Sequence, residues 1–156
     1  MRIRTFALGL IGMIAALAPT AMNADARGRH PAYLRARTDL RTAQFLMRVR
    51  EEPNVTRNLE RAAQETEAAI HEIDHAAVLD RKDMMDRPPV DTHLDRRHRM
   101  ENILRLLRSA RADLAREEDN GQARGWRDDA FRHIDAALEH VHRAAVDLHW
   151  DHELGF

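Results

Sequence analysis

Residues 130–148 read AFRHIDAALEHVHRAAVDL, and this stretch decides the fold class. Its apolar side chains recur at steps of three and four residues, at Ala130, Ile134, Ala137, Val141, Ala144 and Leu148. This spacing gives an α-helix one apolar face, whereas a half-buried strand would alternate apolar and polar residues. The stretch therefore predicts an amphipathic helix.

Three other stretches, within residues 33–47, 59–77 and 100–114, have the same spacing. Their apolar faces consist of Tyr33, Ala36, Leu40, Ala43 and Met47; of Leu59, Ala63, Thr66, Ile70, Ile73 and Ala77; and of Met100, Ile103, Leu107, Ala110 and Leu114. Breaks that contain proline or glycine separate the stretches at residues 52–54, 87–91 and 119–121. The sequence therefore predicts an all-α protein with four helices.

The two halves of the chain resemble each other. Residues 40–43 (LRTA) match residues 107–110 (LRSA), and the alanine-rich residues 68–78 match residues 136–146. Two similar helical hairpins joined in sequence predict an up-down-up-down four-helix bundle.

The first 26 residues have the three parts of a secretory signal peptide. Arg2 and Arg4 precede an apolar run of 13 residues, 6–18, and the small-residue site Ala24-Asp25-Ala26 follows it. The run is shorter than the roughly 20 apolar residues that span a bilayer. We therefore expect residues 1–26 to be removed, leaving residues 27–156 as a single domain with a short C-terminal His/Asp tail, without a membrane span, in the periplasm or secreted.

Composition limits the classes of function. The chain has no cysteine, which excludes disulfides, thiolate metal sites and c-type haem attachment. Loss of the signal segment leaves 23 basic and 25 acidic residues, mixed in sign along the chain, and this balance argues against nucleic acid as a partner. Ten histidines make the charge sensitive to mild acid, because the ordinary pKa of histidine is about 6.5.

Histidine is the residue type that carries the predicted function. His71 and His75 are four residues apart, so two imidazoles share one face of the second helix and can chelate one ion. They lie away from the apolar face and should be exposed to solvent. Glu67, Glu72 and Asp74 are close enough in sequence to assist.

More histidines follow in the fourth helix and the tail. His140 and His142 lie on opposite shoulders of the apolar face, where they could meet His71, His93 or His98 from another helix. Residues 147–153 hold two imidazoles and three carboxylates. The predicted metal ligands are His71, His75, His140, His142, His149 and His152.

Each candidate also has an ordinary explanation. Exposed histidines are commonly surface groups that hydrogen-bond neighbouring carboxylates. Met84, Met85 and Met100 could offer thioethers to Cu(I), although methionines more often fill gaps under a loop. Haem bound by Met47 and a fourth-helix histidine is the least expected cofactor, because nothing in the sequence marks a haem-sized pocket.

Motifs of catalysis are missing from the sequence. HExxH, GxSxG, a glycine-rich phosphate loop and a Glu-x-x-His pair do not occur, and Ser109 is the only serine. We therefore predict that the protein is not an enzyme.

Three segments resemble a group of uncharacterised exported helical proteins of soil bacteria: residues 30–41 (HPAYLRARTDLR), 86–91 (DRPPVD) and 112–119 (ADLAREED). That group has no established activity, and its typical histidines are here Ala32, Arg35 and Arg87. Residues 133–141 (HIDAALEHV) are also similar to the histidine- and alanine-rich repeats of the small metal-binding protein family, which are periplasmic four-helix bundles. The second resemblance implies copper, nickel or zinc as the ligand.

The favoured hypothesis is an exported, non-enzymatic bundle that binds or buffers divalent copper, nickel or zinc through histidines. The alternative is a structural or stress-adaptor protein of the cell envelope, with histidines that respond to pH and a protein partner that is unknown.

Overall fold

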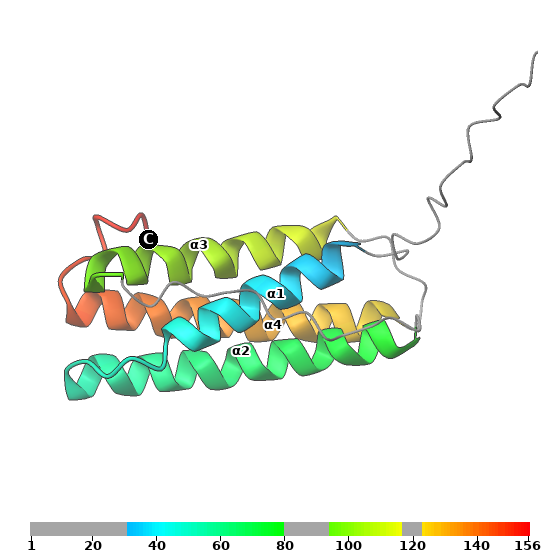
Figure 1. Ribbon diagram of the computed structural model, residues 1–156, viewed down its shortest axis with the longest axis horizontal. Coiled ribbons are helices and arrows are strands. Elements are labelled where there is room, and N and C mark those ends of the chain that lie inside the picture. Colours follow the sequence, from blue (N-terminus) through cyan, green and yellow to red (C-terminus); the bar gives the residue numbers. More distant parts are fainter. Residues whose placement is uncertain (1–30, 80–93, 117–122) are drawn as a thin grey trace, which may run out of the picture.

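The computed structural model describes residues 31–79, 94–116 and 123–156, and these form four α-helices (Figure 1). The helices are α1 (Pro31–Leu46), α2 (Pro53–Leu79), α3 (Arg96–Ala115) and α4 (Ala123–Asp147). The prediction of an all-α, four-helix protein is confirmed. The signal segment 1–26 and the breaks at 87–91 and 119–121 lie outside the described residues.

Proline and a capping side chain account for where α1, α2 and α3 begin. α1 and α2 each begin at a proline, which suits the first turn because its missing N–H needs no partner there. Asp95 caps α3, and its carboxylate accepts a hydrogen bond from the His98 backbone N–H at 2.9 Å. The predicted break at residues 52–54 thus coincides with the start of α2.

Every pair of neighbouring helices in the bundle is antiparallel. The ion pairs Arg35–Asp113 and Arg37–Asp74 join α1 to α3 and to α2. At the other end of α1 the chain turns into α2 next to the start of α3. α2 packs most extensively against α4, and α1 against α3, whereas α1 and α4 lie on one diagonal and α2 and α3 on the other.

The order of helix directions differs from the predicted up-down-up-down order. α1 and α4 run from right to left in Figure 1, while α2 and α3 run from left to right, so the chain runs up-down-down-up. The 16 residues between Leu79 and Arg96 can span about 50 Å when extended. α2 is about 40 Å long at 1.5 Å per residue, so this connection is long enough to return to the end of the bundle where α2 began.

The predicted apolar faces meet in one core. All the predicted positions of the first and third helices are buried, and so are those of the fourth except Leu148, which is half-buried. In α2, Ala62 takes the buried place predicted for Ala63. Thr66 is fully buried, and its hydroxyl donates to the Ala62 carbonyl at 2.8 Å, so burial leaves no unpaired hydroxyl.

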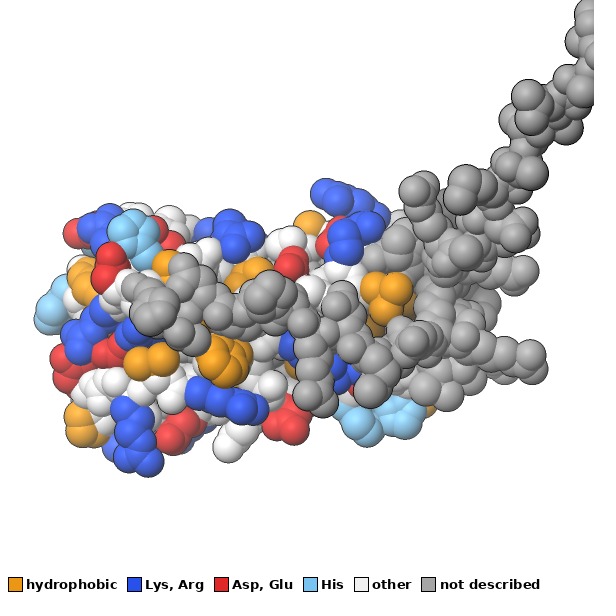
Figure 2. Space-filling model, viewed as in Figure 1, with side chains coloured by type: hydrophobic (Ala, Val, Ile, Leu, Met, Phe, Trp, Pro, Cys, Tyr) orange, Lys and Arg blue, Asp and Glu red, His pale blue; other side chains and the backbone are white. Residues whose placement is uncertain are grey.

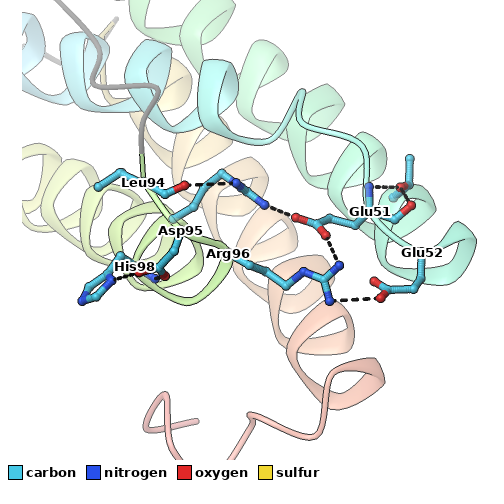
Figure 3. A network of polar contacts seen from close by, with 8 residues as sticks. Glu51, Glu52, Leu94, Asp95, Arg96 and His98 are labelled. Carbon is cyan, nitrogen blue, oxygen red and sulfur yellow. Dashed lines mark hydrogen bonds and ion pairs between the residues drawn. The ribbon is translucent and has the colours of Figure 1, made fainter.

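A polar network fixes the start of α3 against the turn between α1 and α2 (Figure 3). The Glu51 carboxylate, only 6% exposed, pairs with Arg99 and, at 2.6 Å, with Arg96. Arg96 also reaches the exposed Glu52 at 3.0 Å. Thr56 closes the turn, because its hydroxyl accepts from the Glu51 N–H at 2.8 Å and donates to the Glu51 carbonyl at 2.9 Å.

Candidate metal centre

The histidine pair of α2 lies on its solvent face. Ile70 and Ile73 are buried in the core, whereas His71 and His75 are exposed on the other side of the helix. The His71 side chain is 69% exposed. The prediction that this pair faces solvent is confirmed, and Figure 2 shows histidine side chains at the lower edge of the molecule, where α2 lies in Figure 1.

The two imidazoles point their Nε2 atoms at each other. His71 Nε2 and His75 Nε2 are 3.3 Å apart, and the ring centroids are 4.3 Å apart at an interplanar angle of 77°. This separation lies within hydrogen-bond range, and which nitrogen donates depends on the tautomers of the two rings. Both Nε2 atoms thus lie close together on one side of the helix.

Glu72 lies beside this pair on the same helix. Its Oε1 is 4.0 Å from His71 Nδ1, and its buried Oε2 has no hydrogen-bond partner among the described residues. A carboxylate in this place can accept a hydrogen bond from Nδ1–H, which would leave Nε2 as the ligand nitrogen. Asp74, by contrast, is held by Arg37 at 2.6 Å and is not free to assist as the sequence suggested.

Trp126 adds an aromatic wall that sequence reasoning missed. Its indole stacks on the His75 ring, with centroids 4.6 Å apart and an interplanar angle of 15°. Trp126 lies in the first turn of α4, and it reaches His75 only because α4 runs antiparallel beside α2. The only sequence signal was an aromatic residue one turn before the apolar face of the fourth helix.

The other four predicted ligands do not join this pair. His142 stacks on Phe156 with centroids 4.4 Å apart, and His140 Nδ1 is buried without a hydrogen-bond partner among the described residues. His152 is 98% exposed and lies 3.6 Å from Asp151. The structure therefore spreads the six predicted ligands over separate places on α2, α4 and the tail.

His149 has a backbone role at the end of α4. It adopts the left-handed conformation, with φ of 59°, and its N–H donates to the Val146 carbonyl at 2.9 Å. The Trp150 N–H donates to the Ala145 carbonyl at 2.9 Å. These two bonds form a Schellman cap, in which glycine is the usual residue at the position of His149.

The imidazoles of two further histidines are hydrogen-bonded to carboxylates. His133 Nδ1 lies 2.7 Å from Glu65 and His98 Nδ1 lies 2.5 Å from Asp95. The hydrogen bond to Asp95 raises the pKa of His98, and the backbone N–H and imidazole of His98 lower the pKa of Asp95. His93, Met84 and Met85 lie outside the described residues, and Met100 is buried in the core.

The described residues, 31–79, 94–116 and 123–156, contain no group of three or more histidine, aspartate or glutamate side chains that could hold a metal ion. The face of the molecule in Figure 2 mixes positive and negative side chains without a continuous basic stripe. Within the same described helices, none combines the length and apolar character needed to cross a bilayer.

Comparison of the chain with protein-family models, with curated proteins and with solved structures found no match. The two resemblances drawn from the sequence motifs therefore stay predictions.

Proposed function

We propose that the protein binds a divalent transition metal ion at His71 and His75 and does so without catalysing a reaction. The observation that carries this proposal is the 3.3 Å separation of the two exposed Nε2 atoms. Metal–imidazole bonds are about 2.0–2.1 Å long, so an ion that bonds to both atoms at this separation makes an N–metal–N angle of about 107°. That value is close to the tetrahedral angle.

For both nitrogens to bind one ion, the imidazole rings of His71 and His75 must rotate slightly. Two imidazoles that aim both lone pairs at one ion at this angle have centroids about 5 Å apart, compared with 4.3 Å here. The terminal torsion of histidine has broad minima, and these side chains are exposed. Binding therefore needs no change in the helix backbone.

Glu72 supports the same assignment. Its Oε1 lies 4.0 Å from His71 Nδ1, so a small turn of the ring would let Nδ1–H donate to this carboxylate, and that tautomer leaves Nε2 free for the metal. The proposal does not extend to His140, His142, His149 and His152, because in the described structure these residues lie apart from the pair and belong to no group of three or more ligands.

Calorimetric titration with Cu(II), Ni(II) and Zn(II) tests the proposal. We expect saturable binding at pH 7.5 that weakens at pH 5.5, because imidazole must lose its proton to bind. His71→Ala and His75→Ala should each abolish it, whereas the matched control His152→Ala should leave it unchanged. Undiminished binding in His71→Ala would refute the assignment.

Tryptophan fluorescence gives a second readout at the same place. In Trp150→Phe, only Trp126 remains, and it stacks on His75. Cu(II) is paramagnetic and should quench this emission at the stoichiometry seen by calorimetry. Quenching that persists in His75→Ala would place the ion elsewhere.

A further inference from the structure

We propose that the His71–His75 pair is half of a zinc site that joins two copies of this chain, each supplying two imidazoles to one ion. This inference rests on the proposed function, and it adds the identity of the metal, the remaining ligands and a partner. Three features of the described residues support it. They are the N–metal–N angle that the pair allows (its bite angle), the lack of further ligands near the pair among these residues, and the exposed side chains around it.

The bite angle suits a tetrahedral ion better than a square-planar one. A 90° angle with bonds of about 2.0 Å requires nitrogens about 2.8 Å apart, and the pair is 3.3 Å apart. Zn²⁺ has no geometric preference from its d electrons and is held tetrahedrally by four ligands in closed sites. The pair thus supplies two corners of such a site.

The described part of the chain, residues 31–79, 94–116 and 123–156, offers little to fill the other two corners. Asp74 is tied to Arg37, and one oxygen of Glu72 is buried beneath the pair. Glu67 lies on the same face one turn before His71, yet the three do not form a group that could hold an ion. A second copy of the pair, related by a two-fold axis through the ion, completes four imidazoles.

The surface around the pair is suited to contact with a second copy. The His71 side chain is 69% exposed, so its ring is open to contact from outside the chain. Trp126, 36% exposed, flanks His75, and tryptophan is among the residues that contribute most at interfaces. Glu67 from each copy would place one carboxylate near the ion, and the two negative charges would balance the two positive charges of Zn²⁺.

The test is the mass of the protein in solution, measured by sedimentation velocity as Zn(II) is added at pH 7.5. We expect the mass to double and the change to be complete at one ion per two chains. Chelation with EDTA should restore the monomer. His71→Ala and His75→Ala should stay monomeric, while His152→Ala should dimerise like the parent. Circular dichroism should show that all variants keep their helix content.

The possible outcomes separate this inference from the proposed function. Zinc that binds at one ion per chain while the mass stays that of a monomer would overturn the dimer and leave the metal site standing. No zinc, copper or nickel binding at all would overturn both. A zinc-dependent dimer that survives His71→Ala would show that other residues hold the ion, and the inference would be rejected.

Discussion

Glu51 is the residue whose replacement should disturb the fold most among the polar side chains. Its carboxylate is 6% exposed and the paired Arg99 side chain 12% exposed, so Glu51→Ala leaves a cation in a site largely closed to water. The carbonyl of Leu94, 3.5 Å from Arg99, is the one other hydrogen-bond acceptor that the described structure gives this guanidinium. Burial lowers the pKa of Arg99, in agreement with the small exposure of its side chain.

Two estimates give the size of the effect. Breaking a buried ion pair by removing one partner typically costs about 3–5 kcal/mol. Coulomb attraction between unit charges about 4 Å apart, at an effective dielectric constant of about 20, is also about 4 kcal/mol. We therefore expect Glu51→Ala to lower the free energy of unfolding by about 4 kcal/mol, a large part of the roughly 5–15 kcal/mol that stabilises a typical domain.

Urea denaturation of Glu51→Ala, Arg99→Met and the double variant measures this coupling. The double variant should be more stable than the sum of the single changes implies, because no charge is left without a partner. Glu52→Ala is the matched control, since the exposed Glu52 also pairs with Arg96 and its loss should change little. Additive single changes, or a loss below about 1 kcal/mol for Glu51→Ala, would refute this account.

Three further predictions concern caps and core. Asp95→Asn retains the cap on the His98 N–H but removes the charge that raises the pKa of His98, so this pKa should fall in an NMR titration. Because the pKa of His98 is raised, the Asp95–His98 pair stabilises the fold below about pH 6.5, and this stabilisation is lost as the pH rises through the pKa of His98. Because the pKa of Asp95 is lowered, the stabilisation is also lost at the acidic end, as the pH falls through the pKa of Asp95. The stability difference between the parent and Asp95→Asn should accordingly be larger at pH 5.5 than at pH 8, and an equal difference would contradict the pairing. His149→Gly should stabilise the protein by about 1 kcal/mol in thermal denaturation, because glycine adopts φ of 59° without steric cost, and a loss of stability would argue against the cap. Leu107→Ala should cost about 2–5 kcal/mol in urea, since its side chain is fully buried, while the exposed Val146→Ala should be nearly neutral.

The candidate site was only partly predictable. The spacing of His71 and His75 is a local property of a helix, so their shared, exposed face followed from sequence. The stacking of Trp126 on His75 did not, because these residues are 51 positions apart and meet only through the packing of α4 on α2. The C-terminal histidines looked like the densest ligand cluster, yet His149 is placed by a backbone cap and His152 points into solvent.

The helical class, the approximate positions of the helices and the faces that they bury can all be read from the sequence, because hydrophobic periodicity and proline breaks act within a few residues. The order of the helices in space cannot be read in this way and is seen only in the folded molecule. The apolar faces of α3 and α4 would fill a core in either direction, and the 16 residues before α3 are long enough to permit the return along the bundle. This order brings together residues far apart in the chain, among them the buried pair of Glu51 and Arg99, which joins the start of α3 to the turn that begins α2.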